Sequence, residues 1–396
     1  MYRKVKYLCI ALLYFAAAVS LNDGLNVFAL YGAIPLSFLM SFRLGNSIKD
    51  NNYIKKIVWL FVWLGVSYLG AVYVDEANNQ MKNYLGVFLL TVTLANLSKD
   101  EECIPWLYGI YVILFIQALV YANNHIMAGG FDVATDRLND AKLNANTIAY
   151  YTFFVTFAIY ILGENHWIKK KLLKNIFRLL FLSMYIVSFM VALFTASRQV
   201  LIIQIPLLLF LSYLRYINGA TKLQKFVFII ITFAVCLASV DRILDAYDNS
   251  FLKIRAEQDA KEDVRMLLLK DAVSVGMENP LFGVGPGNYV RYSFNNHFSH
   301  CTFTELFANT GFIGLCIFGS MLFLYIKRQW LRMRTFRSDK TFLVFLIVGL
   351  IYLIDNIFYV FYIDLWLMGF FILIASHAEV YYRLKISTLE YRLFCQ

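Results

Sequence analysis

Apolar stretches of membrane-spanning length recur along most of the chain, and they constrain its fold more than any other feature. Of the 396 residues, 60% are hydrophobic and only 16% are charged, which is far from the composition of soluble domains. A transmembrane helix needs about 20 consecutive, mostly apolar residues. The sequence therefore predicts an all-α polytopic membrane protein, with a single integral membrane domain over residues 1–396.

The hydropathy pattern predicts about twelve transmembrane helices. The first follows a run of basic residues but lacks a small-residue cleavage site, so we expect a retained helix rather than a removed signal peptide. The second is interrupted by Gly32 and Pro35. The predicted spans are about 7–21, 25–42, 57–74, 84–98, 104–122, 146–163, 176–195, 199–216, 225–240, 303–326, 341–358 and 361–378.

Basic residues cluster on one side of this topology. Four groups fall on the side of the two termini: Lys55/Lys56, Lys169–Lys171, Lys222/Lys225 and the stretch 327–340. Positively charged loops stay in the cytoplasm, so both termini are predicted to be cytoplasmic in an inner-membrane protein. The same asymmetry accounts for the net charge of +10 without any nucleic-acid partner.

Two loops on the predicted outer side, 121–145 and 241–302, are longer than a turn. The second, about 60 residues between the ninth and tenth helices, predicts a small loop subdomain. Apolar residues at 264, 267, 268, 272 and 275 share one helical face. They predict a helix over 262–275 that lies along the membrane surface, with Arg265 projecting from its side. Only Cys301 of the six cysteines falls near the outer face, so no disulfide framework is expected there.

The second loop ends in a built turn. NPLFGVGPGNY, at 279–289, contains two of the five prolines of the chain. Proline fixes φ and glycine permits positive φ, which predicts a shaped loop rather than a spacer. His300 follows where this loop becomes a membrane helix, and its imidazole can give or take a proton near neutral pH. It is our first candidate for catalysis, against the alternative of an ordinary hydrogen-bonded histidine at the interface.

Three arginines join His300 on the predicted outer side, where basic residues are scarce. Arg198 lies in TASRQ, at 195–199, a polar break so short that the flanking helices must form a hairpin. Arg137 and Arg265 lie in the two outer loops. An arginine at a helix end can simply extend to the lipid headgroups. However, guanidinium groups match the bidentate geometry of phosphate oxygens, so the cluster favours an anionic, phosphorylated, lipid-linked ligand.

Three neighbours of His300 could orient its imidazole: Thr304, Glu305 and His297. If the helix continues through His300, Thr304 shares its face, and Glu305 points about 140° away because each residue turns by about 100°. Glu305 would then not orient the imidazole directly. His297, in the preceding loop, is predicted to lie at the rim of the site.

Three polar residues near the outer ends of the last two helices could bind sugar hydroxyls: Asp355, Asn356 and Asp364. They could also simply be satisfied at the interface, which is the interpretation that we favour. No metal or cofactor is predicted. The HFSH pair at 297–300 lacks an acidic or cysteine partner, and GVGPGNY has neither the strand nor the helix of a nucleotide-binding fold.

These motifs resemble, in order and spacing, the membrane domain of the bacterial O-antigen ligase and O-antigen polymerase superfamily. They are NPLFGVGPGNY, His300 followed at +11 by Gly311 and at +14 by Gly314, TASRQ before an apolar helix, Arg265 in an amphipathic stretch, and DRLNDAKLNANTIAYY at 136–151. The resemblance covers about residues 130–320. One departure is Cys301, at a position that is often Asn in this family.

The resemblance implies a metal-independent membrane glycosyltransferase with a GT-C-like fold, acting on undecaprenyl-diphosphate-linked glycans at the periplasmic face of the bacterial inner membrane. Arg198 and Arg265 would bind the diphosphate, with Arg137 as a third arginine, and His300 would be the essential histidine. Glu305 and Asp355 are accessory candidates. Donor and acceptor would be lipid-linked oligosaccharides, and a chain-length regulator and a flippase are candidate partners. A diphosphate leaves readily once its charge is held, and the attacking hydroxyl needs a base.

Within this superfamily we predict a polymerase of O-antigen, capsule or exopolysaccharide repeat units. The complete GVGPGNY turn resembles polymerases more than ligases, and the outer face lacks the basic excess that a phosphorylated lipid A-core would favour. The alternative is an O-antigen ligase, which transfers the finished chain to lipid A-core. A polysaccharide or small-molecule transporter would be expected to show polar sites at the midplane and repeat symmetry, and a structural scaffold would tolerate loss of the arginines and the histidine.

Overall fold

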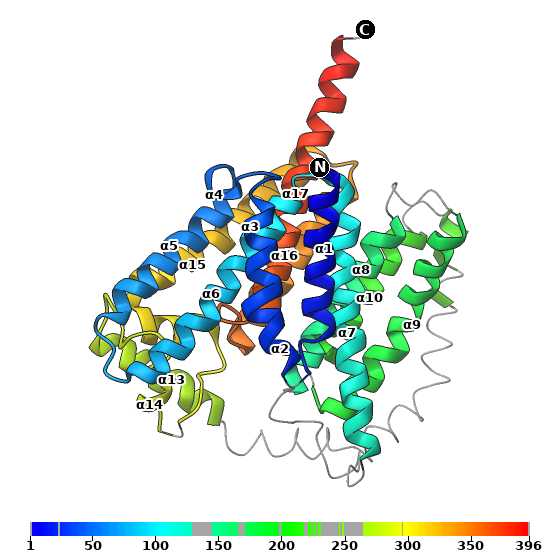
Figure 1. Cartoon of the computed structure of the whole chain (residues 1–396). Helices are drawn as coiled ribbons and strands as arrows, with labels where there is room; N and C mark the ends of the chain where they lie inside the picture. The colour runs from blue at the N-terminus through cyan, green and yellow to red at the C-terminus, as the bar shows by residue number, and fades with distance from the viewer. Residues whose placement is uncertain are drawn as a thin grey trace. The chain divides into compact units, whose positions relative to one another are not determined.

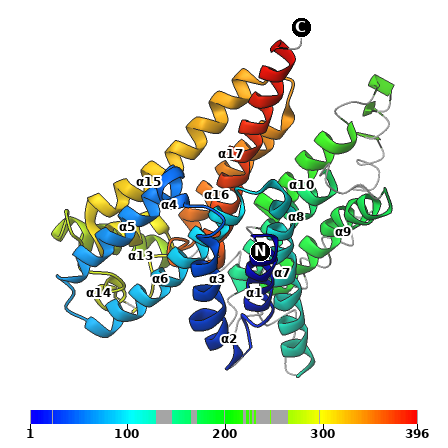
Figure 2. The ribbon, with the colours of Figure 1, turned by 45° about the horizontal axis from the view of Figure 1, so that its top comes forward.

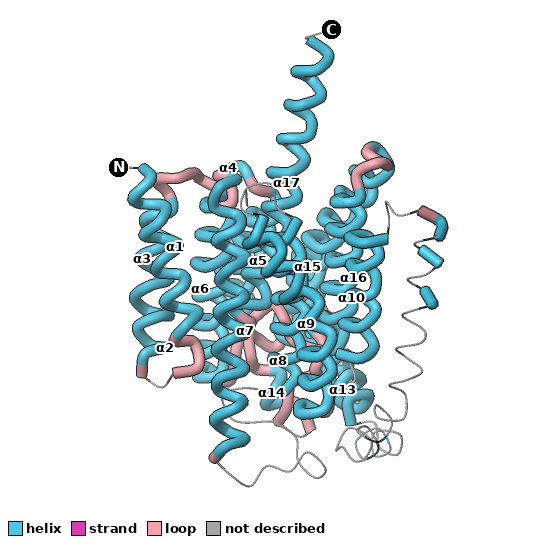
Figure 3. Tube along the Cα trace, turned by 90° about the vertical axis from the view of Figure 1, so that its right-hand side faces the viewer, coloured by secondary structure: helices cyan, strands magenta, loops and turns pink. Residues whose placement is uncertain are grey.

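The computed structural model describes residues 2–22, 24–128, 145–164, 171–197, 200–217, 264–294 and 296–394, with a few residues between 221 and 248. Every regular element in these ranges is a helix (Figure 1, Figure 3), which confirms the all-α prediction. Among the described residues, seven helical segments are long and apolar enough to cross a membrane: Glu101–Met127, Asn146–Glu164, Lys171–Thr195, Val200–Ile217, Thr302–Thr335, Lys340–Phe358 and Leu365–Thr388. The count of twelve stays a prediction, and the span at 225–240 falls mostly outside the described residues.

The chain packs as two compact units. Unit 1 comprises Met1–Ala16, Val27–Leu107 and Asp263–Gln396, and unit 2 comprises Ala17–Asn26 and Tyr108–Glu262. The NPLFGVGPGNY loop and His300 belong to unit 1, whereas TASRQ belongs to unit 2. The single membrane domain and the loop subdomain over 241–302 stay predictions.

The first hundred residues form mostly helices joined by short turns. They are α1 (Tyr2–Ala18), α2 (Leu25–Phe28), a π-helical turn (Ala29–Ala33), α3 (Ile34–Ser41), α4 (Ser47–Asp50), α5 (Asn52–Tyr68) and α6 (Val74–Leu97). The interruption expected at Gly32 and Pro35 is the π-helical turn. Pro35 lies in the first turn of α3, where its missing N–H removes no helical hydrogen bond.

Helices α5 and α6 begin earlier than the predicted spans at 57 and 84. The side chain of Asn51 caps α5 by accepting hydrogen bonds from the backbone N–H groups of Tyr53 and Ile54. Lys55 and Lys56 therefore lie within α5, near its beginning, rather than in a loop. Helix α6 has two acidic residues in its first turn. Their negative charge interacts favourably with the positive end of the helix dipole. The predicted spans begin late because hydropathy alone does not detect polar first turns or their caps.

Five helices complete unit 1: α13 (Val264–Glu278), α14 (Tyr289–Tyr292), α15 (Thr302–Thr335), α16 (Lys340–Phe358) and α17 (Leu365–Phe394). In two views α13 and α14 lie beside the beginning of α15 and the end of α5 (Figure 1, Figure 2). Helix α13 ends before Asn279-Pro280, as predicted. Its buried side is narrower than the predicted stripe, because Val264 and Leu267 are 42% and 54% exposed.

Aromatic rings fix α5, α15, α16 and α17 against one another. The ring of Tyr53 lies 6.1 Å from that of Tyr325, and Tyr325 meets Phe371 edge-on at 5.4 Å. The rings of Phe371 and Tyr352 stack at 4.8 Å. Such pairs add about 0.5–1.5 kcal/mol each beyond their buried area. They give unit 1 a rigid frame on which its loops are held.

Unit 2 contains α8 (Ala145–Glu164), α9 (Lys171–Thr195), α10 (Ile205–Ser212) with π-helical turns at Val200–Gln204 and Tyr213–Ile217, and most of α7 (Ile104–Met127). The predicted hairpin around TASRQ is confirmed, because α9 packs on the segment that follows it and the hydroxyl groups of Tyr185 and Ser212 lie 2.9 Å apart. Arg215 pairs with Glu164 at 2.7 Å, which links the end of this hairpin to α8.

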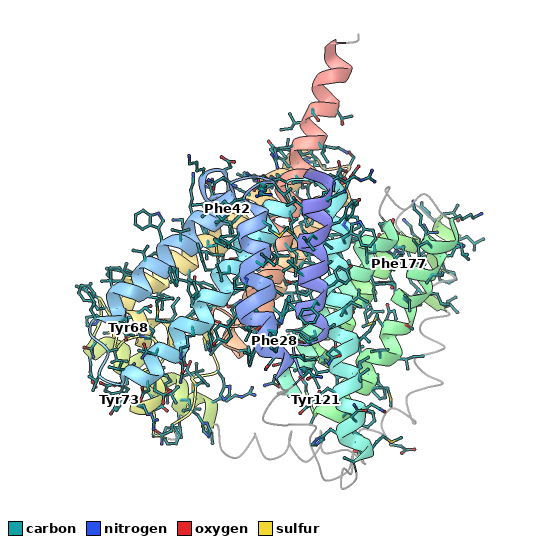
Figure 4. The ribbon with its side chains drawn as sticks, viewed as in Figure 1. Phe28, Phe42, Tyr68, Tyr73, Tyr121 and Phe177 are labelled. Carbon is teal, nitrogen blue, oxygen red and sulfur yellow. The ribbon has the colours of Figure 1, made fainter. Side chains whose placement is uncertain are left out.

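Large apolar side chains cover much of the surface. Phe28, labelled in Figure 4, is 66% exposed, and Trp59 and Ile186 are 62% and 70% exposed. A soluble protein rarely exposes contiguous apolar surface of this kind. Together with the apolar spans, it indicates an integral membrane protein.

Candidate active site

Helix α15 is broken at Gly311, near its beginning. Gly311 has φ 69° and ψ −171°, a conformation that side chains with a Cβ rarely adopt. A Cβ there would lie 2.3 Å from the carbonyl carbon and oxygen of Leu281. The break therefore requires glycine for two reasons, the backbone torsion and the close approach of the NPLFGVGPGNY loop.

The loop satisfies the backbone groups that the break releases. In an intact helix the carbonyl groups of residues 308–310 would accept from N–H groups one turn later. Here the contacts are Val284 N to Ala308 O (2.9 Å), Gly285 N to Asn309 O (3.0 Å), the Trp63 ring N–H to Thr310 O (2.8 Å) and Phe312 N to Pro280 O (2.7 Å). A broken helix is tolerated in a membrane protein only where protein groups replace the lost bonds.

The turn glycine Gly283 allows this pairing. Its φ is 69°, and a Cβ would lie 2.3 Å from the carbonyl carbon of Asn309. The glycine-rich motif and the break in α15 thus depend on each other, because each supplies hydrogen-bond partners to the other. The prolines and glycines predict a shaped loop, and hydrogen bonds to the break in α15 hold its shape.

Two residues at the end of the loop anchor it to neighbouring helices. Asn288, fully buried, accepts a hydrogen bond from the backbone N–H of Tyr73 at 2.7 Å and donates to the Tyr73 carbonyl at 3.1 Å. Figure 4 labels Tyr73 and Tyr68, which flank the α5–α6 connection. The hydroxyl of Tyr289 donates to the Leu268 carbonyl of α13 at 2.9 Å. Burial, with nearby carboxylates, raises the pKa of Tyr289 well above its usual range, so it remains a donor.

His300 lies outside α15, because the helix begins at Thr302. Its φ is 57°, and its side chain is half-buried. Left-handed backbone at a non-glycine residue persists only where the surroundings impose it, and such residues gather at functional sites. The prediction that Thr304 shares the face of His300 was wrong, since it assumed a helix that continues through the histidine.

Glu305 holds the residue that precedes His300. It is 1% exposed, and its Oε2 accepts a hydrogen bond from the backbone N–H of Ser299 at 2.7 Å. Thr304 donates to the Ser299 hydroxyl at 3.1 Å. The prediction that Glu305 does not orient the imidazole directly stays a prediction. Its carboxylate fixes the backbone of the loop from which the histidine projects.

Sequence reasoning missed three polar residues behind Glu305. The amide of Asn309 donates to Glu305 Oε1 and to the hydroxyl of Tyr362, both at 3.3 Å. Gln80 donates to the same hydroxyl at 3.2 Å. Asn309 could have been found, because it lies one helical turn after Glu305. Gln80 and Tyr362 carry no local signal, since they come from α6 and from the α16–α17 connection.

Arg265 is the second residue of α13. It is half-buried, and no ion pair joins it to another described residue. The same helix borders an open cleft of about 380 Å³ lined by Leu267, Lys270, Asp271, Ser274 and Phe294. The cleft joins α13 to the loop that leads to His300, because the backbone N–H of Phe294 donates to Asp271 at 3.3 Å.

Arg198 and Arg137 lie outside the described residues. The turn just before Arg198 is described, and it is strained. Ala196 is buried and has φ 46°, which costs an alanine about 1–2 kcal/mol. Left-handed backbone at a non-glycine residue therefore occurs at Ala196, two residues before Arg198, and at His300.

The connection between α16 and α17 lies against the start of α15. The hydroxyl of Thr302 donates to the Tyr359 carbonyl and accepts from the backbone N–H of Phe361, both at 2.8 Å. Asp364 caps α17 by accepting from the backbone N–H groups of Trp366 and Leu367, both at 3.0 Å. Burial raises the pKa of Asp364 to about 6.

Asp355 is buried in α16, and its accessory role stays a prediction. Its neighbour Asn356 donates to the Tyr352 carbonyl at 2.8 Å, but its buried Oδ1 accepts no hydrogen bond from a described residue, so the prediction that Asn356 is simply satisfied holds for its N–H group and not for its oxygen. In the described part of the chain, His, Cys, Asp and Glu form no group of three that could hold a metal ion. Metal independence stays a prediction too.

Comparison with known proteins finds a family that is similar to the motif region. Residues 143–319 match the family model described as O-Antigen ligase. The matched range contains Arg198, Arg265, the NPLFGVGPGNY loop, His300 and Gly311, and it confirms the resemblance stated from the sequence. No curated protein matches the chain. The family indicates a function of the O-antigen ligase and polymerase type.

Proposed function

We propose that this chain, a member of the O-antigen polymerase and ligase superfamily, is a repeat-unit polymerase. It transfers an undecaprenyl-diphosphate-linked glycan to a sugar hydroxyl of another lipid-linked repeat unit at the periplasmic face of the inner membrane. The observation that carries the proposal is His300, half-buried and held with φ 57° by a loop that a buried carboxylate fixes. The polymer is O-antigen, capsule or exopolysaccharide.

His300 acts as the general base. Its neutral imidazole accepts the proton of the acceptor hydroxyl while that oxygen bonds to the anomeric carbon of the donor. The bond from this carbon to the diphosphate oxygen breaks, and its electron pair leaves with undecaprenyl diphosphate. Attack from the side opposite the diphosphate inverts the anomeric configuration. The fixed loop reduces the entropy lost in aligning base and hydroxyl.

Arginines hold the negative charge of the leaving group. Arg265 suits this role because no described residue occupies its guanidinium group with an ion pair. Arg198 follows the strained turn at Ala196, and Arg137 supplies a third cation. A planar guanidinium binds two phosphate oxygens at once, and the developing charge on the diphosphate makes these contacts strongest in the transition state.

The cleft beside α13 supports a polymerase over a ligase. Its lining contains one cation, Lys270, and one carboxylate, Asp271, together with Phe294. Aromatic faces and single carboxylates suit neutral sugars, whereas the phosphorylated core that a ligase meets would favour several cations. We assign this cleft to the acceptor sugar.

A ligase is the second candidate, and the description of the family model favours it. Gel analysis of lipopolysaccharide from a deletion strain separates the two. A polymerase defect leaves core that bears a single repeat unit, because ligation continues. A ligase defect leaves bare core while long lipid-linked polymer accumulates, and this pattern would refute our proposal.

A further inference from the structure

A second polar cavity lies in unit 1 at the end away from His300. It measures about 430 Å³ and is walled by α4, the first turn of α5, the last turn of α6, α15 and α17. In Figure 1 this is the end marked by α4, whereas α13 and α14 lie at the other end. Nothing in the proposed transfer reaction uses it.

The cavity carries an excess of positive charge. Lys99 is paired with Asp50 at 2.7 Å, so this pair is neutral. Glu379, by contrast, is shared by two arginines, Arg328 at 2.9 Å and Arg332. Its single charge leaves one of the two uncompensated.

Arg383 adds a further cation to the lining. It is exposed, and no ion pair joins it to another described residue. In the lining, Lys99, Arg328 and Arg383 exceed Asp50 and Glu379 by one positive charge. Arg332, which also pairs with Glu379, does not line the cavity and adds a positive charge behind it. A site with this excess favours an anion.

Ser47 offers a hydrogen bond that the protein does not use. It lines the cavity and is fully buried, and its hydroxyl has no hydrogen-bond partner among the described residues. Its backbone N–H is satisfied by Asn96 at 2.7 Å. A buried hydroxyl without a partner is uncommon in folded proteins and calls for a ligand or a water.

The cavity lies where the helices pass from apolar to charged residues. In α15 the apolar run ends at Lys327, Lys99 follows the end of α6, and in α17 the first Lys or Arg is Arg383. This change in composition marks the level of the lipid headgroups. An anion that binds here is therefore at the depth of a phospholipid phosphate.

We propose that this cavity binds the phosphodiester headgroup of an anionic phospholipid. Arg383 contributes a guanidinium group to the phosphate oxygens, Ser47 donates its free hydroxyl, and Arg328 adds charge from α15. A bound headgroup would connect α5, α6, α15 and α17, so it would stabilise unit 1. The shared chemistry is phosphate recognition, and a free phosphate ester is the other source that the test must separate.

The test measures thermal unfolding of the full-length protein in a neutral detergent while short-chain lipid is added. Dioctanoyl phosphatidylglycerol should raise the midpoint by about 2 °C or more, and dioctanoyl phosphatidylcholine should not. Arg383→Gln should raise the half-saturating phosphatidylglycerol concentration about tenfold, because a charge-assisted hydrogen bond is lost. Ser47→Ala should raise it a few-fold without lowering stability in the absence of lipid. Arg337→Gln is the matched control, an exposed arginine at the same end that does not line the cavity.

Equal phosphatidylglycerol responses in Arg383→Gln and Arg337→Gln would overturn the site, as would equal responses to the two lipids. Glycerol 3-phosphate or inorganic phosphate that matches phosphatidylglycerol at the same concentration would overturn the lipid assignment in favour of a soluble ligand. Stabilisation by the anionic lipid alone, reduced in Arg383→Gln and in Ser47→Ala, supports the proposal.

Discussion

His300 combines a half-buried proton acceptor with an imposed backbone conformation. Its φ of 57° is uncommon for a residue with a Cβ, and Glu305 fixes the residue before it at 2.7 Å. Two effects of a substitution can therefore be separated, loss of the imidazole and relaxation of the loop. Glycine adopts this φ without strain.

We predict that His300→Gly abolishes polymer formation while the protein remains inserted and folded. Loss of a general base lowers the rate by about 10²–10⁴-fold, whereas glycine leaves the backbone free to keep its conformation. The measurement is chain length on a gel in a complemented deletion strain, with the amount of membrane-inserted protein measured in parallel. His297→Ala is the control because this exposed neighbour is assigned no chemistry. Wild-type chain length in His300→Gly would remove the histidine from the mechanism.

The break in α15 is stable only because the NPLFGVGPGNY loop bonds its free backbone groups. We predict that Gly311→Ala lowers the free energy of unfolding by about 3 kcal/mol or more, since the new Cβ meets Leu281 and the torsion is strained. Gly319→Ala, in the same helix with nothing within 4 Å of the added Cβ, should be neutral or slightly stabilising. Thermal unfolding in detergent compares the two. Equal effects would mean that the break is not built into the fold.

Two helix caps should respond to pH with opposite sign. Burial raises the pKa of Asp364 from 3.8 to about 6. Its contribution to stability is therefore full below about pH 4 and is lost as pH rises through about 6. Asp339 caps α16 through Thr341 at 3.1 Å. Burial acts against its charge, but hydrogen bonds from Lys385 and Thr341 outweigh it and lower the pKa, so Asp339 stabilises the fold above about pH 4.

Asparagine keeps the capping oxygen at either position but cannot ionise. Relative to wild type, Asp364→Asn should gain stability between about pH 5 and pH 8, and Asp339→Asn should be less stable than wild type across this range. The midpoint of thermal unfolding at both pH values is the measurement. A wild-type pH profile in both variants would contradict the assignment of these carboxyl groups.

Local patterns predicted much of the fold and the position of His300, but not the contacts that hold it. Proline and glycine at 279–288 predicted a shaped turn because their torsional limits are intrinsic. Gly311 contributed to the family resemblance, but the break at it was not predicted, because a glycine in an apolar run is also compatible with an intact helix. The role of Glu305 was missed because the helix was assumed to begin before His300. Gln80 and Tyr362 meet 282 positions apart in the chain, and no local period encodes such a contact.

Topology across the membrane is the prediction that concerns the whole chain. Cys301 was expected near the outer face, but it is only 5% exposed, so its thiol is a poor reporter. Ser274, exposed on α13, and Ser338, exposed between α15 and α16, are better positions. In a background without reactive cysteines, a membrane-impermeant maleimide added to intact cells should label Ser274→Cys and spare Ser338→Cys. The reverse pattern would place the His300 loop in the cytoplasm.

Polymerisation is the central claim, and the purified protein tests it most directly. The assay supplies radiolabelled undecaprenyl-diphosphate-linked repeat units, together with lipid A-core, to the protein in liposomes. We predict lipid-linked products of two or more repeat units, formed whether or not lipid A-core is present and absent with His300→Gly. Label that moves only to lipid A-core, with no lipid-linked oligomers, would contradict the account and identify a ligase.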